Sequence, residues 1–256
     1  MQKGICNLSV VPVRRIPSDK SEMVSQLLYG EIFTITDTLE GWLLINNDFD
    51  NYEGWIDKKQ IRILSEIESG QNILPETRIC TAPISSLMQT DGTILHVSFG
   101  SMLSNIAIDP NSVVDETIQN YSDFQKIQEP DKSKIMEFAR LFINSPYIWG
   151  GKSIFGIDCS GLVQLTFKAA GFQLPRDAVQ QIEHGSLVSF IEQAEPADLA
   201  FFDNDEGQIV HVGILLNQNQ IIHSSGKVRI DSIDHYGIFN HNLHRYSHRL
   251  RIIKRI

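Results

Sequence analysis

The first 125 residues contain short β-like runs and no long helical period, and this pattern most constrains what the chain can fold into. Within residues 1–64, turn chemistry such as Pro17-Ser18-Asp19 and Glu40-Gly41 separates one run from the next. Five short strands in so short a segment predict a small β-barrel. The five runs lie at residues 8–13, 25–28, 32–38, 42–46 and 54–56.

The order of signals in this segment resembles a bacterial SH3-like domain of the kind attached to cell-wall enzymes. The resemblance is carried by RRIPSDKSEMVSQLLYGE, EGWLLI and YEGWIDKKQI, and it assigns residues 1–64 to one such domain, with Trp42 and Trp55 expected in its core. Residues 65–125 have weaker runs at 78–81, 94–98 and 101–106, with a hairpin turn at Thr90-Asp91-Gly92-Thr93. We interpret residues 65–125 as a second, diverged SH3-like barrel.

A third unit is expected over residues 126–256. Glu129-Pro130-Asp131 breaks the β-like pattern and can open a helix, and a second helix is predicted over residues 160–170, ending at Gly171. Two β-like runs follow at 208–216 and 220–224, joined by residues 217–219, and then a basic tail. Helices first and antiparallel strands afterwards predict an α+β fold class. The apolar face of the first helix comprises Ile135, Met136, Phe138, Ala139, Leu141 and Phe142.

Charge and cysteine content exclude several function classes. The chain has 22 Lys+Arg against 31 Asp+Glu, a net charge of −9, so neither nucleic acid nor an anionic membrane is expected as its main partner. No run approaches the ~20 apolar residues of a membrane span. Three cysteines without a CxxC spacing predict neither a disulfide framework nor a metal finger. In MQKGICNLSVVPVRR the basic pair follows the apolar stretch, the wrong order for a secretory signal, so a cytoplasmic protein is expected unless a precursor signal was removed.

Cys159 is the candidate nucleophile. In Asp158-Cys159-Ser160-Gly161 it follows a residue that can cap the predicted helix, so its thiol falls in the first helical turn. There the free backbone N–H groups and the helix dipole favour the thiolate, and we expect them to lower the thiol pKa. The alternative is a buried structural cysteine, which is also how we interpret Cys6 and Cys80.

A nucleophilic cysteine needs a base, and His211 and His223 are the candidates. They lie 12 residues apart in consecutive β-like runs. If residues 217–219 form a three-residue turn, residue 211 pairs with 225, and His223 is its diagonal neighbour on the same face. His211 would then be the base and His223 the group that orients it. The alternative is that both are ordinary barrel histidines.

These residues carry a second resemblance. The run PYIWGGKSIFGIDCSGLVQLTFKAAGFQLPRDAVQQ, followed by ADLAFFD, HVGI and HSSG, resembles the NlpC-type family of bacterial cell-wall cysteine peptidases. The resemblance spans about half the chain and implies a reduced papain-like fold with Cys159, His211 and His223 as the catalytic residues. It also implies that the Tyr147 hydroxyl helps to stabilise the oxyanion together with the Cys159 backbone N–H.

An SH3-like domain before such a unit narrows the resemblance to peptidases that cut murein peptides between D-glutamate and the diamino acid. These enzymes require a free amino-terminal L-alanine, which they bind through the first SH3-like domain. Glu22 and Tyr52 best fit the residues that hold the ammonium group, although each can equally be an ordinary surface residue. The remaining expected peptide contacts are Asp158, Ser160, Arg176 and Asp177.

Other interpretations of the sequence have weaker support. His241, His244 and His248 have helical spacing that would suit a metal site, but a tail without Cys, Asp or Glu partners favours a solvated face. We therefore expect no metal and no organic cofactor, and a monomer. The alternatives to a recycling endopeptidase are a wall-binding adaptor with a degenerate catalytic unit and a secreted hydrolase of intact wall. The sequence leaves open whether the diamino acid is lysine or diaminopimelate.

Overall fold

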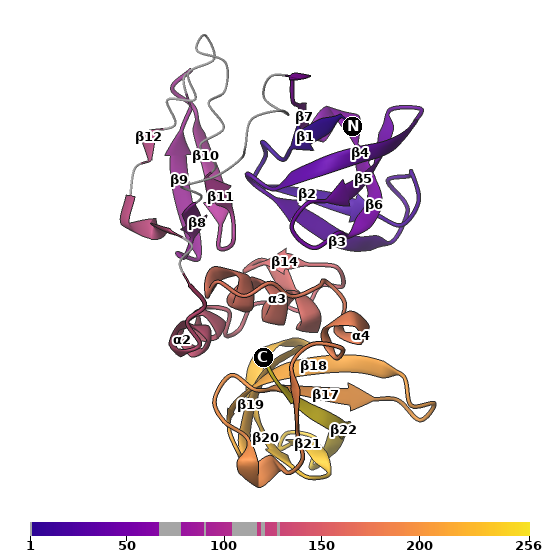
Figure 1. Cartoon of the computed structure of the whole chain (residues 1–256), viewed down its shortest axis with the longest axis vertical. Helices are drawn as coiled ribbons and strands as arrows, with labels where there is room; N and C mark the ends of the chain where they lie inside the picture. The colour runs from indigo at the N-terminus through magenta and orange to yellow at the C-terminus, as the bar shows by residue number, and fades with distance from the viewer. Residues whose placement is uncertain (1, 67–77, 90, 104–116, 119–120, 127–128) are drawn as a thin grey trace. The chain divides into compact units, whose positions relative to one another are not determined.

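The computed structural model describes residues 2–66, 78–89, 91–103, 117–118, 121–126 and 129–256. The chain divides into two compact units, Met1–Glu129 and Pro130–Ile256 (Figure 1). Sequence reasoning placed the start of the C-terminal unit at residue 126, four residues before Pro130.

The first part of the N-terminal unit is a seven-stranded antiparallel sheet with the order β3-β2-β6-β5-β4-β1-β7. Alternate side chains of its strands are buried, as in Val11 and Val13, which agrees with the period of two that the sequence shows. The five expected strands are all present, whereas β1 and β7 were too short to predict. Trp42 and Trp55 are half-buried rather than enclosed in the core. The elements are β1 (Lys3–Ile5), β2 (Val10–Arg14), β3 (Met23–Leu28), β4 (Ile32–Leu39), β5 (Trp42–Asn47), β6 (Glu53–Asp57), the 3-10 turn η1 (Lys58–Gln60) and β7 (Arg62–Ile63).

The second part of this unit contains two three-stranded sheets, β10-β9-β12 and β11-β8-β13. Their shared core includes Cys80, Leu87, Val97 and Phe124. The expected run at 101–106 is described only as far as Leu103, and Thr90 of the expected turn also lies outside the described residues. A second SH3-like barrel remains a prediction. The elements are β8 (Arg78–Cys80), β9 (Ile84–Met88), β10 (Ile94–Ser98), β11 (Met102–Leu103), β12 (Thr117–Ile118), η2 (Tyr121–Asp123) and β13 (Phe124–Lys126).

The C-terminal unit is an antiparallel barrel with helices packed against it (Figure 1). Strands β17 to β22 form a closed ring of pairings, since β22 pairs with both β17 and β21, and β16 extends the sheet beside β22. This arrangement confirms the α+β class. The elements are α2 (Ser133–Leu141), β14 (Lys152–Ser153), β15 (Gly156–Ile157), α3 (Cys159–Ala169), α4 (Ala178–Gln181), β16 (Ser186–Val188), η3 (Ile191–Gln193), β17 (Leu199–Asp203), β18 (Ile209–Asn217), β19 (Gln220–Ser225), β20 (Lys227–Asp234), β21 (Gly237–Asn240) and β22 (Arg245–Arg255).

The expected basic tail is in fact the longest strand of this barrel. In β22, Ile253 is buried between β16 and β17, while Arg249 and Arg255 point outward to acidic partners. Arg249 pairs with Asp203, and Arg255 pairs with Asp198. The prediction of a tail was wrong because the frequent basic residues hid a strand with only one fully buried position.

Helix α3 is the central element of the unit, and all of its residues are buried. It packs against β18 and β19 on the barrel and against α2. It ends at Ala170, followed by Gly171 with φ +88°, the left-handed conformation expected at that position. Of the apolar face predicted for α2, Ile135, Phe138 and Ala139 are buried, whereas Leu141 is exposed.

None of the described helices is long and apolar enough to cross a membrane.

Candidate active site

Cys159 is the first residue of α3, as predicted. Asp158 has an extended backbone and caps the helix, since its Oδ1 accepts a hydrogen bond of 2.7 Å from the Gly161 N–H. Its Oδ2 accepts a second from the Gly150 N–H at 2.8 Å. The carboxylate of Asp158 therefore ties the start of α3 to the glycine-rich loop and fixes the place from which the Cys159 thiol projects.

Arg176 is buried beneath this helix start and holds the Asp158 carboxylate in place. Its guanidinium binds both carboxylate oxygens of Asp158, at 3.0 and 2.6 Å, and the Ser160 hydroxyl at 2.8 Å. The Arg176 side chain is only 1% exposed. Asp158, Ser160 and Arg176 are thus engaged with one another inside the unit, and Arg176 acts on the site through Asp158. Asp177, half-buried, begins α4 with a capping box to Gln180 and stays an expected peptide contact.

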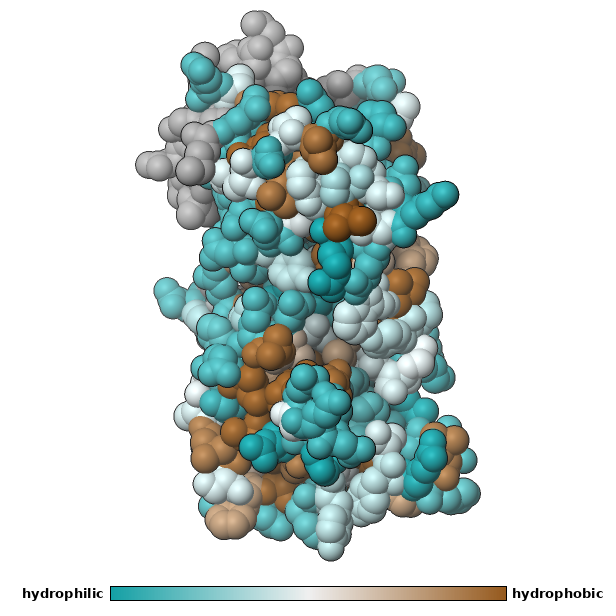
Figure 2. All heavy atoms as spheres, turned by 90° about the vertical axis from the view of Figure 1, so that its right-hand side faces the viewer, coloured by the Kyte–Doolittle hydropathy of each residue, from teal (hydrophilic) through white to brown (hydrophobic). Residues whose placement is uncertain are grey.

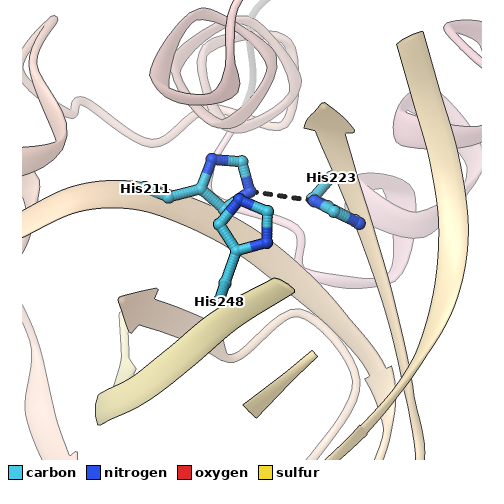
Figure 3. A group of neighbouring side chains, drawn as sticks. All are labelled: His211, His223 and His248. Atoms are coloured by element: carbon cyan, nitrogen blue, oxygen red, sulfur yellow. Dashed lines mark hydrogen bonds between the residues drawn. The ribbon is translucent and has the colours of Figure 1, made fainter. Parts of the chain in front are cut away.

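The two strand histidines are hydrogen-bonded to each other. His211 Nε2 lies 2.9 Å from His223 Nδ1, and both rings are buried (Figure 3). The pairing of Ile214 with Ile222 gives the register that sequence reasoning expected, in which 211 faces 225. The turn itself differs, because Asn217 pairs with Gln220 and an irregularity between Leu215 and Asn217 takes up the extra residue. The juxtaposition of the two histidines is as predicted, and their catalytic roles remain predictions.

Two further residues extend this pair, and sequence reasoning missed both. His223 Nε2 lies 3.0 Å from Oδ2 of Asp231, a buried residue of the neighbouring strand β20. Arg229 donates from Nη2 to the other oxygen of Asp231 at 2.7 Å. The signal in the sequence was the alternation of Arg229 and Asp231 after a strand that ends in HSSG, which marks two polar residues on one face of β20.

His248 also belongs to the site, so its assignment to a solvated face was wrong. It lies on β22, and its ring stacks on that of His211 with centroids 4.2 Å apart and planes 25° apart (Figure 3). His241 and His244 are exposed in the turn before β22, as expected of a solvated face, but the backbone there is not helical. The barrel closure that brings β22 beside β18 through β17 could not be read from the tail.

The three histidines have ring nitrogens within 4.8 Å of one another, a spacing that could hold a metal ion. The ring orientations account for the group without one. His211 and His223 share a hydrogen bond, and the second nitrogen of His223 is bound to Asp231. Because the His211 and His248 rings are nearly parallel, their in-plane lone pairs do not converge on one point. The geometry therefore fits a hydrogen-bonded chain better than a metal site.

Burial determines the protonation of Cys159 and His211. It contradicts the expectation that the helix start lowers the thiol pKa. Burial raises the pKa of the Cys159 thiol to about 12, with Asp158 adding to the rise, and the N–H groups of Val212 and Ser160 oppose it only in part. Burial also holds the pKa of His211 well below its usual value, assisted by His223 and His248. The helix start does not by itself make a thiolate here. The resting pair is a neutral thiol and a neutral imidazole, so the thiol must give up its proton as it attacks.

Tyr147 lies close enough to Cys159 for a negative charge on the thiolate to raise the pKa of the Tyr147 hydroxyl. Burial raises the pKa of Tyr147 to about 12, and the charges of Cys159 and Asp158 act in the same direction. The hydroxyl is therefore protonated at neutral pH and can donate a hydrogen bond. This is what the expected oxyanion role requires.

Glu22 and Tyr52 belong to the other unit and lie at one end of its sheet. Glu22 comes immediately before β3 and Tyr52 immediately before β6, and β2 lies between those strands, with Arg14 paired to both Met23 and Trp55. Glu22 forms an ion pair of 2.6 Å with Arg15, and its side chain is 39% exposed. The two residues thus lie at the same end of the sheet, at the starts of two strands separated by β2.

A groove of about 540 Å³ lies on the C-terminal unit between α4, β18 and β22. It does not enclose the catalytic candidates, because neither Cys159 nor the three clustered histidines line it. Figure 2 shows hydrophobic residues gathered on part of the surface of this unit. Val179, one of the residues that line the groove, is an exposed apolar side chain. The groove is lined by Val179, Ile182, Glu183, Gly207, Gln208, Ile209 and Arg251.

A cysteine at the start of a buried helix, packed on an antiparallel barrel that carries its histidines, is the arrangement of the papain-like class. Family comparison gives the particular branch. The NlpC/P60 family model matches residues 144–246, and that of the bacterial dipeptidyl-peptidase SH3 domain matches residues 13–61. The chain therefore contains an NlpC/P60 peptidase domain, preceded by a bacterial SH3 domain.

Similar proteins cover both units. A gamma-D-glutamyl-L-lysine dipeptidyl-peptidase of Bacillus subtilis is 29% identical over 217 residues, 78% of this chain and 71% of that protein. Dipeptidyl-peptidase 6 of Lysinibacillus sphaericus is 27% identical over 254 residues, 85% of this chain and 87% of that protein. The crystal structure of an NlpC/P60 family protein from Bacillus cereus superposes with a TM-score of 0.80 over 99% of both chains at 20% identity, which confirms the fold.

Proposed function

We propose that the protein hydrolyses the bond between γ-D-glutamate and the L-diamino acid in murein peptides with a free amino-terminal L-alanine. The observation that carries this proposal is the hydrogen-bonded His211–His223 pair on the strands that face Cys159. All three positions of the expected triad are filled, which argues against a degenerate binding adaptor. Relatives named for gamma-D-glutamyl-L-lysine cleavage match across both units, which supports the substrate class.

The reaction is a two-step acyl transfer. Sγ of Cys159 attacks the γ-carbonyl of D-glutamate while Nδ1 of His211 takes the thiol proton, and the resulting imidazolium returns that proton to the departing amine of the diamino acid. Water then attacks the thioester with His211 as base, which frees the γ-carboxylate and restores the thiol. Tyr147 and the Cys159 backbone N–H stabilise the oxyanion in both steps.

Free L-alanine is the proposed specificity determinant. An ammonium group needs a carboxylate or a phenol oxygen, and Glu22 and Tyr52 offer both at the same end of one sheet. Arg15 occupies part of the Glu22 carboxylate, but a carboxylate can accept from more than one donor. Intact wall, in which L-alanine is linked through an amide, would be a poor substrate. We therefore propose a role in recycling free peptides, and a cytoplasmic location with it.

The test is mass spectrometry of the products from a panel of defined peptides. L-Ala-γ-D-Glu-L-Lys and its diaminopimelate counterpart are each offered free and N-acetylated. We expect L-Ala-D-Glu as a product, with kcat/KM about 30-fold or more lower for the acetylated forms, because acetylation removes the positive charge that a carboxylate would bind. Cleavage at another bond would reject the reaction, and equal rates on both forms would reject the free-amine requirement.

Variants assign the residues in the same assay. Cys159→Ala and His211→Ala should abolish turnover without unfolding the chain. Glu22→Gln should lose most of the discrimination between free and acetylated peptides, whereas Asp37→Asn, an exposed carboxylate of β4, should keep it. Full discrimination in Glu22→Gln would move the role to another residue.

A further inference from the structure

The hydrogen-bonded histidine pair ends on a buried carboxylate that no triad residue accounts for. Asp231 is 6% exposed, and it accepts from His223 and from Arg229. Burial alone would raise the pKa of Asp231, but the hydrogen bonds from His223 and Arg229 outweigh it and hold the pKa below its usual value. Asp231 is therefore an ionised carboxylate, and a carboxylate only accepts hydrogen bonds.

The Asp231 carboxylate determines which ring nitrogen of His223, and in turn of His211, carries the hydrogen. A neutral imidazole carries one ring hydrogen, so the bond to Asp231 places the hydrogen of His223 on Nε2 and leaves a lone pair on Nδ1. That lone pair must accept from Nε2–H of His211 across the 2.9 Å contact. Nδ1 of His211, on the side of the ring away from His223, then carries the free lone pair (Figure 3).

We propose that Asp231 is a positioning residue of the active site: acting through His223, it holds His211 in the one tautomer that can accept the Cys159 proton. The proposal rests on the proposed cysteine-peptidase function. When the thiol proton arrives on Nδ1 of His211, both nitrogens of that ring carry hydrogen, and the positive charge faces a chain of bonds that ends on the Asp231 carboxylate. The same chain then stabilises the imidazolium in both steps of the reaction.

Because Arg229 contacts Asp231, the variant Asp231→Asn is an informative test of the histidine tautomers. Arg229 only donates, and its hydrogen bond to Asp231 runs from Nη2 to Oδ1, whereas its Nε lies 2.7 Å from Oδ2 without forming a hydrogen bond. In Asp231→Asn we therefore expect the amide oxygen to face Nη2, where Oδ1 now lies. The amide NH₂ group then faces His223 and donates to its Nε2. Both imidazoles must change tautomer in response, and the hydrogen of His211 moves to Nδ1, where it blocks the thiol proton.

The first test needs no variant and no substrate. In the full-length chain labelled with ¹⁵N, ring nitrogen shifts identify which nitrogen of each histidine carries hydrogen. We expect hydrogen on Nε2 of both His211 and His223 at neutral pH. Hydrogen on Nδ1 of His223 would overturn the proposal. Because the measurement needs no peptide, it stands even if the proposed substrate is wrong.

The second test compares Asp231→Asn with Asp234→Asn, a carboxylate of the same strand that caps the turn after it. The readouts are the ring tautomers, the rate at which iodoacetamide alkylates Cys159, and peptide turnover. We expect Asp231→Asn to show hydrogen on Nδ1 of both rings, with alkylation slowed and kcat reduced at least tenfold and up to about 10⁴-fold at little changed KM. Asp234→Asn should stay within about twofold of the wild type.

Rescue separates tautomer control from loss of packing. With Arg229→Met added to Asp231→Asn, the amide is free to turn its oxygen toward His223, and the wild-type tautomers and part of the alkylation rate should return. Wild-type tautomers and alkylation in the single Asp231→Asn variant would overturn the proposal. A normal alkylation pattern without cleavage of any murein peptide would instead reject the proposed substrate and leave Asp231 in its role.

Discussion

The Asp158–Arg176 pair shows how a buried residue that takes no part in the reaction itself holds the nucleophile in place. Arg176 is almost wholly buried and binds both oxygens of the carboxylate that caps α3. A buried pair adds little net stability by itself, because both charges lose their water. Removing one partner is different, since the other is left buried and uncompensated.

Arg176→Met should therefore lower the free energy of unfolding by about 3–5 kcal/mol. Urea denaturation of the full chain measures it. Arg249→Met is the matched control, because Arg249 is 58% exposed in its ion pair with Asp203, and its loss should lower the free energy of unfolding far less. Adding Asp158→Asn to Arg176→Met should recover part of the loss, since Asn still caps a helix. Equal losses in the two arginine variants would contradict the argument.

Position 161 requires glycine because the Asp158 carboxylate and the loop backbone leave no room for a Cβ. A Cβ at this position would lie 2.6 Å from the backbone oxygen of Gly151 and 2.9 Å from Oδ1 of Asp158. Gly161→Ala should therefore destabilise the unit by about 1–3 kcal/mol, even though alanine favours helices, because neither the loop backbone nor the cap can move freely. We also expect a lower kcat, since Cys159 lies two residues earlier. A melting temperature and a kcat equal to those of the wild type would show that the loop gives way without cost.

At the scale of elements, the sequence predicted the features that depend on local periodicity and missed those that depend on closure of the barrel. The α3 start, its cap, its glycine end and the register of β18 with β19 all follow from short-range pattern and turn length. Strand β22 does not, because its outward face is basic and only the barrel around it shows that its other face is buried. His248 was missed for the same reason, since it reaches the site through strand pairings distant in sequence. Asp231 lies only eight residues from His223 on the next strand, so its signal was local and was overlooked.

His248 makes the element β22 sensitive to acid. Burial lowers its pKa to about 4, with His223 adding to the fall and Asp231 opposing it. Between that value and the ordinary 6.5, the unfolded chain binds the proton more readily than the folded one, so stability must fall as the pH drops through this window. The limit is about 1.4 kcal/mol per pH unit, reduced because solvent reaches part of the ring.

His248→Phe keeps an aromatic ring on His211 and removes this titration. Urea midpoints between pH 7 and pH 4 should therefore fall less steeply in His248→Phe than in the wild type. Some slope should remain, because the pKa of His211 is also depressed by burial. His184→Phe, at an exposed position, is the control. Parallel curves for wild type and His248→Phe would show that His248 is not the group responsible.

At the scale of the whole molecule, the residues proposed for chemistry and those proposed for selection lie in different compact units. The unit Pro130–Ile256 holds Cys159, His211, His223 and Asp231 and has its own closed barrel and core, whereas Glu22 and Tyr52 lie in Met1–Glu129. The sequence predicted Cys159, His211 and His223 in one unit and Glu22 and Tyr52 in the other, but it did not indicate Asp231, and motifs describe each unit alone. Whether selection depends on the first unit is therefore a question for experiment.

The isolated unit 130–256 answers it. Since every residue of the proposed proton chain lies within it, Cys159 should be alkylated by iodoacetamide at a rate close to that of the full chain, and circular dichroism should show it folded. Its kcat/KM on L-Ala-γ-D-Glu-L-Lys should fall about 30-fold or more, because the ammonium loses the carboxylate proposed to bind it. N-acetylation should then make no further difference, since the free and blocked peptides are equivalent to a unit without Glu22 and Tyr52. If the isolated unit alkylates normally and still prefers the free peptide by the full factor, selection for the amine belongs to the catalytic unit, and the search for its carboxylate moves to Asp177 and its neighbours.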